Sequence, residues 1–252
     1  QKNGLNILTD PHLTLRASPF SFAGPKRYTP PGLSIEDLPI IDVILISHSH
    51  YDHLDKLTIK KVYERQSENP PKIFVPLKLK EWFLNLGINH VTELDWNESS
   101  KLGEWHVHAV PVQHWSSRTP FDRNKTLWAG WVMETEGFRF FFAGDTGYSK
   151  DFKNLGERFG QFDLAAIPIG AYEPRWFMKT QHVNPEEAVM IHQDINARYS
   201  VGIHWGTFEL TDEPLNEPPQ RLRSALKKKG ITNEEFFVMK HGETKLLKYL
   251  EM

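Results

Sequence analysis

The fold is decided by Ser47-His48-Ser49-His50-Tyr51-Asp52-His53-Leu54-Asp55. This stretch directly follows a β-branched apolar run, Ile40–Ile46, which predicts a buried strand. The three histidines and Asp52 therefore lie on a turn between that strand and a helix. Four ligand-capable side chains so close in sequence can surround a metal ion, and imidazole with carboxylate suits zinc and other borderline metals. A polar loop with surface histidines is the alternative.

The composition restricts the class of protein. The chain has 252 residues, of which 39% are hydrophobic, and a formal net charge of −2, so it is not a disordered chain. The absence of cysteine excludes disulfides, cysteine-ligated zinc and thiol nucleophiles. The balanced charge argues against a dedicated nucleic-acid-binding protein. No apolar run is long enough to predict a membrane-spanning helix.

The start of the chain, Gln1-Lys-Asn-Gly, has neither a methionine nor an apolar signal-like run. A strand-like run, Leu5–Thr9, follows almost at once. We therefore expect that the chain begins inside a longer protein.

Short apolar runs alternate with helical patterns, which predicts an α/β or mixed architecture. Besides the two runs already named, strands are expected at 73–75, 105–110, 127–134, 138–142, 162–169, 200–204 and 236–239, with a hairpin at Glu136-Gly137. Helices are expected over 79–86, from the capping residue Asn184 onward, and around Leu222 up to Gly230. No repeat or long linker divides the chain, so we expect a single domain over residues 1–252.

The pattern His-x-His-x-Asp-His resembles the signature of the metallo-β-lactamase superfamily. Members of that superfamily place further ligands at the ends of later strands, and His114, Asp145 and His204 stand at such positions here. The resemblance implies a first metal held by His48, His50 and His114, and a second held by Asp52, His53 and His204, with Asp145 bridging the two. The other histidines, His12 and His241 among them, have no companions at ligand spacing and are expected to be structural or exposed.

A narrower likeness extends over most of the chain. The stretches Phe140–Tyr148, Phe162–Met178, Asn184–Ala188, Ile203–Phe208 and Lys240–Glu243 resemble the N-acylphosphatidylethanolamine-hydrolysing phospholipase D family. This likeness implies a four-layer αβ/βα sandwich with a dinuclear site at one edge of the two sheets. Two departures are a missing N-terminal extension and Ser49, which stands where the mammalian members have Asn.

The resemblance implies an enzyme that cleaves N-acylphosphatidylethanolamine into phosphatidic acid and an N-acylethanolamine. Phosphodiesters repel nucleophiles, and two metal ions both bind phosphoryl oxygens and lower the pKa of a water molecule. We therefore expect two Zn²⁺ per chain, with Asp145 and Asp52 as the catalytic carboxylates. Gln181 and His182 match family positions near the bound phosphate; a capped loop before the next helix is the alternative for these two.

Other functions stay open at this point. The alternatives are another hydrolase of the same fold, acting on a phosphate-bearing lactone or a nucleic-acid phosphodiester, and a non-catalytic metal-binding scaffold. The expected partner is phospholipid at a membrane surface and not nucleic acid, and the oligomeric state, a homodimer included, is left open. A peripheral membrane or cytoplasmic location follows, with Arg175–Met178 and Trp82-Phe83 as candidate membrane contacts and Lys26 and Arg27 as candidate headgroup contacts.

Overall fold

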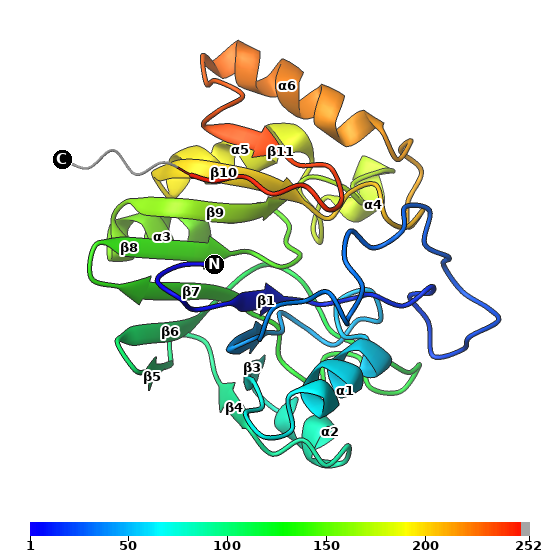
Figure 1. Cartoon of the computed structure of the whole chain (residues 1–252). Helices are drawn as coiled ribbons and strands as arrows, with labels where there is room; N and C mark the ends of the chain where they lie inside the picture. The colour runs from blue at the N-terminus through cyan, green and yellow to red at the C-terminus, as the bar shows by residue number, and fades with distance from the viewer. Residues whose placement is uncertain (248–252) are drawn as a thin grey trace.

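The computed structural model describes residues 1–247 and contains two β-sheets with helices on their outer faces (Figure 1). The smaller sheet is parallel and has the order β1 (Ile7–Thr9), β2 (Val43–Leu45), β3 (Lys72–Pro76), β4 (Val91–Leu94). The larger sheet has the order β11 (Phe236–Val238), β10 (Ala197–Ile203), β9 (Phe162–Pro168), β8 (Phe138–Phe142), β7 (Gly130–Thr135), β6 (Trp105–Val110), β5 (Ser99–Leu102). The helices are α1 (Lys56–Arg65), α2 (Lys80–Leu84), α3 (Asp151–Phe159), α4 (Arg175–Met178), α5 (Pro185–Asp194) and α6 (Glu217–Lys229).

Three apolar clusters separate four layers, and the alternation of side chains along β2 shows how they arise. Val43 and Leu45 point between the two sheets, whereas Ile44 and Ile46 pack against the layer of α1 and α2. A third cluster joins the other face of the larger sheet to α3, α5 and α6. All three clusters consist of buried side chains, as expected for layers packed through apolar faces. The expected four-layer αβ/βα sandwich is confirmed.

Local signals explain where several helices begin and end. The side chain of Asn184 accepts a hydrogen bond from the backbone of Glu187, whose own side chain accepts from the Asn184 backbone, so α5 begins with a capping box. Helix α6 ends at Gly230, whose φ of +69° suits a glycine. Helix α1 begins after Asp55, which caps the backbone N–H of Leu57. The predicted hairpin at 136–137 is also present, because β7 and β8 pair antiparallel around it.

Some predicted elements differ in length. The run Ile40–Ile46 forms only the three-residue strand β2, because Ile40 is exposed and Ile41 pairs its backbone with the side chain of Gln66. The helix expected over 79–86 is limited to α2. Within it Phe83 is fully buried and Trp82 packs on the same apolar cluster, so the candidate membrane face Trp82-Phe83 is wrong: it belongs to the core.

The strand directions gather the predicted site residues at one edge. Strands β8, β9 and β10 are parallel, and two antiparallel steps through β7 give β6 the same direction. The carboxyl ends of β6, β8 and β10 therefore share one edge of the larger sheet, and His114, Asp145 and His204 follow these ends. None of the helices within residues 1–247 is long and apolar enough to cross a bilayer.

Candidate metal centre

Three imidazoles from two loops form the first group. His48 Nε2 lies 2.8 Å from His50 Nδ1, and His114 Nε2 lies 3.3 Å from the same atom. All three side chains can direct one nitrogen to a common point. Ring nitrogens that face one another this closely need a shared proton or a shared cation, and a metal ion supplies the latter.

The second group combines two carboxylates with two imidazoles. The Asp52 carboxylate lies 3.3 Å from His53 Nε2 and 3.2 Å from His204 Nε2. Asp145 completes the group, with ligand atoms of all four side chains within 4.8 Å of one another. The rings of His53 and His204 are stacked with their centroids 5.0 Å apart.

Asp145 lies between the two groups. One of its oxygens is 3.0 Å from His53 Nε2, 3.8 Å from His114 Nε2 and 4.0 Å from His48 Nε2. Its other oxygen is 3.4 Å from His204 Nε2. A carboxylate in this position can bridge two cations, and the structure thus brings together all seven predicted ligands. Their roles as ligands stay a prediction.

Hydrogen bonds at the far nitrogens fix the tautomers of three rings. His53 Nδ1 donates to Asp10 at 2.6 Å, and His114 Nδ1 donates to the backbone carbonyl of Gln181 at 2.9 Å. His48 Nδ1 donates to the Ser47 hydroxyl, which in turn donates to Asp10. Each Nε2 is therefore left with its lone pair toward the centre, as metal-binding histidines require.

Asp10 is the functional residue that the sequence analysis missed. It accepts hydrogen bonds from the Ser47 backbone, the Ser47 hydroxyl and His53, so it orients one ring in each group. It follows β1 as the other site residues follow their strands. An acidic residue at the end of the apolar run Leu5–Thr9 was the available signal.

Backbone conformation holds these ligands in place at two points. Gly144 has a φ of +61°, and a Cβ there would lie 2.4 Å from the Cβ of Ser47, so only glycine lets the Asp145 turn lie against the histidine loop. His204 has a φ of +57°, which is uncommon for a residue with a side chain. The surroundings keep His204 in this conformation, which directs its ring toward Asp52.

The electrostatics differ between the two groups: the first favours neutral imidazoles, whereas the second places ionised carboxylates beside imidazoles that favour a positive charge. Burial, together with the other histidines, holds the pKa of His48 and of His114 well below the usual value. Burial alone would raise the pKa of Asp52 and Asp145, but the adjacent histidines hold both well below the ordinary range. The nearby carboxylates raise the pKa of His53 and His204 despite burial. The second group therefore attracts positive charge.

Unpartnered polar atoms test whether the cluster fits a cation. Buried polar atoms without a hydrogen-bond partner are rare in folded proteins. Within residues 1–247, three such atoms lie where the predicted ligands face one another: His53 Nε2, Asp145 Oδ1 and His182 Nδ1. Nitrogen and carboxylate donors with unused lone pairs suit zinc and similar metals. The residues present therefore fit a metal centre.

The remaining predicted site residues, Gln181 and His182, adjoin the first group. His182 is buried with Nδ1 3.9 Å from Asp145, and burial lowers its pKa to about 4, so the ring is neutral. Gln181 contributes the backbone carbonyl that orients His114. Their contact with a substrate phosphate stays a prediction.

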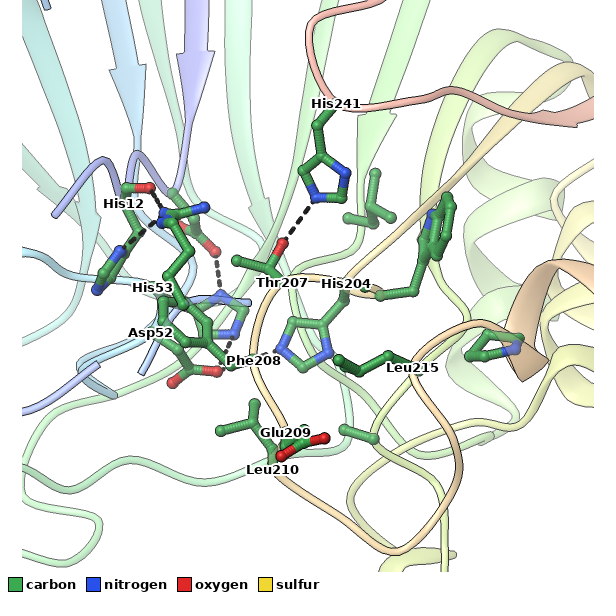
Figure 2. A pocket seen from close by; sticks show the side chains of 18 of the residues that line it. His12, Asp52, His53, His204, Thr207, Phe208, Glu209, Leu210, Leu215 and His241 are labelled. Carbon is green, nitrogen blue, oxygen red and sulfur yellow. Dashed lines mark hydrogen bonds and ion pairs between the residues drawn. The ribbon is translucent and has the colours of Figure 1, made fainter. Parts of the chain in front are cut away.

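A cavity of about 360 Å³ opens beside the second group (Figure 2). Asp52, His53 and His204 line one part of it, and its apolar wall includes Leu13, Trp205, Phe208, Leu210, Leu215 and Pro218. His12 and His241, expected to be structural or exposed, also line it. His241 pairs with the Thr207 hydroxyl, and His12 is held by Arg27.

The side chain of Arg27 makes hydrogen bonds within the protein. Its guanidinium donates to backbone carbonyls of Thr14, Thr29 and His12, which ties the segment after β1 together. The expected role of Arg27 in contacting headgroups is therefore not supported, whereas Lys26 is exposed.

The fold and the clustered histidines and aspartates define a metal-dependent hydrolase of the β-lactamase superfamily. A family model described as "Beta-lactamase superfamily domain" matches residues 5–205. Among solved structures, Igni18, a metallo hydrolase from the archaeon Ignicoccus hospitalis, has a TM-score of 0.68 at 21% identity, covering 99% of this chain and 93% of that one. At this identity the likeness concerns the fold.

Two relatives narrow the family. N-acyl-phosphatidylethanolamine-hydrolyzing phospholipase D 1 of Caenorhabditis elegans is 47% identical over 95% of this chain and 70% of its own length. The mitochondrial N-acyl-phosphatidylethanolamine-hydrolyzing phospholipase D of Saccharomyces cerevisiae is 39% identical over 87% of this chain and 48% of its own length. The chain belongs to the family of N-acyl-phosphatidylethanolamine-hydrolysing phospholipases D.

Proposed function

We propose that this protein hydrolyses N-acylphosphatidylethanolamine to phosphatidic acid and an N-acylethanolamine, with two zinc ions in the centre described above. The observation that carries the proposal is the convergence of seven histidine and aspartate side chains, with Asp145 between the two groups, in a chain 47% identical to a relative named for this reaction. The chain spans 70% of that relative's length.

His48, His50 and His114 would hold one ion, and Asp52, His53 and His204 the other, with Asp145 between them. When bound, the ions supply positive charge for the phosphoryl oxygens and lower the pKa of a water molecule. Asp52 and Asp145, both ionised, provide the negative charge that retains two cations. Asp10, Ser47 and the Gln181 carbonyl keep the imidazoles in the tautomer that binds a metal.

The reaction needs attack on phosphorus by water. The new bond joins the water oxygen to phosphorus, the bond from phosphorus to the ethanolamine oxygen breaks, and a proton ends on the released hydroxyl. We assign His182 to contact with the phosphate, which is supported by its neutral ring beside the centre, with Nδ1 3.9 Å from Asp145. The cavity beside Asp52 and His204 is lined by apolar side chains, which suits a substrate that carries acyl chains next to a phosphodiester.

Product analysis in oxygen-18 water tests the reaction. The purified protein is incubated with N-acylphosphatidylethanolamine, and we expect the label in phosphatidic acid. Label in the N-acylethanolamine would show carbon–oxygen cleavage and contradict the proposed attack. Turnover of bis(nitrophenyl) phosphate without any release from N-acylphosphatidylethanolamine would refute the substrate and retain the metallohydrolase.

Elemental analysis of protein purified without chelator tests the metal centre separately. Two equivalents of zinc per chain are expected. One equivalent or none in a folded protein would contradict the dinuclear site, whereas iron or manganese at two equivalents would change only the identity of the metal.

A further inference from the structure

Among the residues that the structure describes, the exposed aromatic side chains lie in three segments. Within residues 1–247 the exposed large aromatics are Phe20, Phe22, Tyr28, Phe121, Trp176 and Phe177. They lie in segments 11–33, 115–127 and 171–182. Aromatic side chains usually bury most of their surface, so Phe22, Phe121 and Trp176, which are 79%, 84% and 86% exposed, are costly in water.

Each of these segments is joined to the metal centre. Segment 11–33 begins after Asp10, segment 115–127 begins after His114, and segment 171–182 ends at His182. His114, just before segment 115–127, is also bonded to segment 171–182, because the Gln181 carbonyl accepts a hydrogen bond from it. Figure 1 shows the segment after β1 and helix α4 at the same side of the molecule, beyond the carboxyl ends of the strands. The exposed aromatics thus surround the edge that carries the centre.

The same segments carry most of the positive charge of this edge. They contain eight lysines and arginines and two acidic residues, a net charge of +6 in a chain whose total is −2. Lys26, Arg123, Lys125 and Lys179 are exposed. The two acidic residues are partly buried: Asp122 accepts backbone hydrogen bonds from its own loop, and Glu173 pairs with Arg221.

A fourth loop at this edge, residues 205–216, differs from the other three. It has three acidic residues, no basic residue and no exposed aromatic. Glu213 within it accepts three backbone N–H groups of residues 171–173. This loop closes the cavity beside His204 and does not belong to the cationic aromatic surface.

We propose that Phe20, Phe22, Phe121, Trp176 and Phe177, here called the aromatic rim, enter the interface of a membrane that contains anionic lipid. Aromatic rings favour the headgroup level, and lysines and arginines beside them are attracted to anionic lipid. The four exposed cations beside these rings, Lys26, Arg123, Lys125 and Lys179, favour an anionic lipid surface over an apolar protein partner. The proposal rests on the proposed function and deepens it, because it lets the centre take its substrate directly from the bilayer.

Vesicle binding tests the proposal independently of catalysis. The triple variant Phe22→Ala, Phe121→Ala, Trp176→Ala is compared with the wild type by sedimentation with vesicles. One set of vesicles contains phosphatidylcholine alone, and the other contains about 30% phosphatidic acid, roughly the anionic content of a strongly charged leaflet. Each ring withdrawn from the interface lowers partitioning by about tenfold, so the triple variant should lose about 1000-fold. Wild-type binding should weaken without phosphatidic acid and at high salt.

The matched control is Leu84→Ala with Met190→Ala. Both side chains are exposed and apolar, but they lie on α2 and α5 and outside the three segments. This variant should bind vesicles as the wild type does. Circular dichroism and metal content, measured on all variants, show whether fold and centre are intact.

The outcomes separate the two proposals. Hydrolysis of dispersed short-chain N-acylphosphatidylethanolamine by the wild type tests the proposed function. The rim is tested by the turnover of substrate in vesicles divided by the turnover of dispersed substrate. We expect this ratio to fall in the triple variant. Unchanged vesicle binding by a folded, metal-loaded triple variant would overturn the rim. An equal loss of vesicle binding in the control variant would overturn the rim too. So would a triple variant that still binds vesicles but is a monomer where the wild type is a dimer, because the surface would then belong to a contact with a second copy of the chain.

Discussion

Asp10→Asn should weaken metal binding although Asp10 itself is not a predicted ligand. One Asp10 oxygen accepts the Ser47 backbone N–H at 2.7 Å. The other accepts both the Ser47 hydroxyl at 2.5 Å and His53 Nδ1 at 2.6 Å. An asparagine has one acceptor oxygen and an amide group that can only donate, so one side of this arrangement must lose its acceptor.

The consequence reaches both groups of ligands. If the amide faces His53, the ring must turn its lone pair to Nδ1 and place hydrogen on Nε2, the atom directed at the centre. The hydroxyl of Ser47, which orients His48, loses its acceptor in the same step. Replacing a residue that orients a ligand costs about 10–100-fold in metal affinity, which corresponds to about 1.4–2.8 kcal/mol. Asparagine also tolerates the φ of +37° at this position, so backbone strain does not confuse the result.

Competition with a colorimetric chelator measures the affinity without using activity. Asp42→Asn is the matched control, because Asp42 accepts a backbone N–H from Asn6 at the opposite end of β2. We expect the control to keep the metal affinity of the wild type. Metal affinity of Asp10→Asn within about twofold of the wild type, or an equal loss in Asp42→Asn, would refute the orienting role of Asp10.

Three further predictions concern catalysis, pH and packing. Asp52→Asn removes a charge that retains a cation, so turnover at saturating substrate should fall at least about 100-fold; near-normal turnover would contradict the proposed mechanism. Burial lowers the pKa of His192, so its stabilising contribution is complete above the unfolded pKa of about 6.5 and is lost as the pH falls. The difference in unfolding free energy between the wild type and His192→Gln, from urea titrations, should therefore shrink from pH 7.5 to about pH 5, and a constant difference would contradict this. Gly144→Ala should cost about 2 kcal/mol or more in urea unfolding, because a Cβ meets Ser47 and the left-handed φ is strained; an unchanged midpoint would show that the turn can move.

The predicted ligands could be recognised from the sequence because each belongs to a local pattern. An apolar strand followed by histidine or aspartate places that side chain at a sheet edge, and His48, Asp145 and His204 all follow this rule. Asp10 followed it too, but its role depends on a hydrogen bond to a residue 43 positions later. That contact exists only because β1 pairs in parallel with β2, with Leu8 opposite Ile44. The pattern of neighbouring residues in the sequence does not predict this strand register.

The apolar pattern alone leaves some elements incompletely described. A helix was expected after the histidine turn but without bounds, because helix α1 buries only Thr58, Ile59 and Val62 and its start depends on the Asp55 cap. Trp82 and Phe83 show a different error. Their pattern predicts an apolar helix face, but an apolar face suits a protein core as well as a lipid surface. Exposure in the folded chain separates the two cases: Phe83 is fully buried, whereas Trp176 is 86% exposed.

The position of the candidate metal centre, at the sheet edge where the strands end, suits the proposed hydrolysis of a lipid at a membrane surface. Parallel strands end at one edge, so the residues that follow them meet there, and the loops that continue beyond must run outward past the centre. Asp10, His114 and His182 show this directly, since each is next to a segment that carries exposed aromatics. Only a few residues of the chain therefore separate the residues of the centre from the aromatic rim. A substitution in the rim should change how substrate reaches the centre and leave its metal content alone, whereas Asp10→Asn should do the reverse.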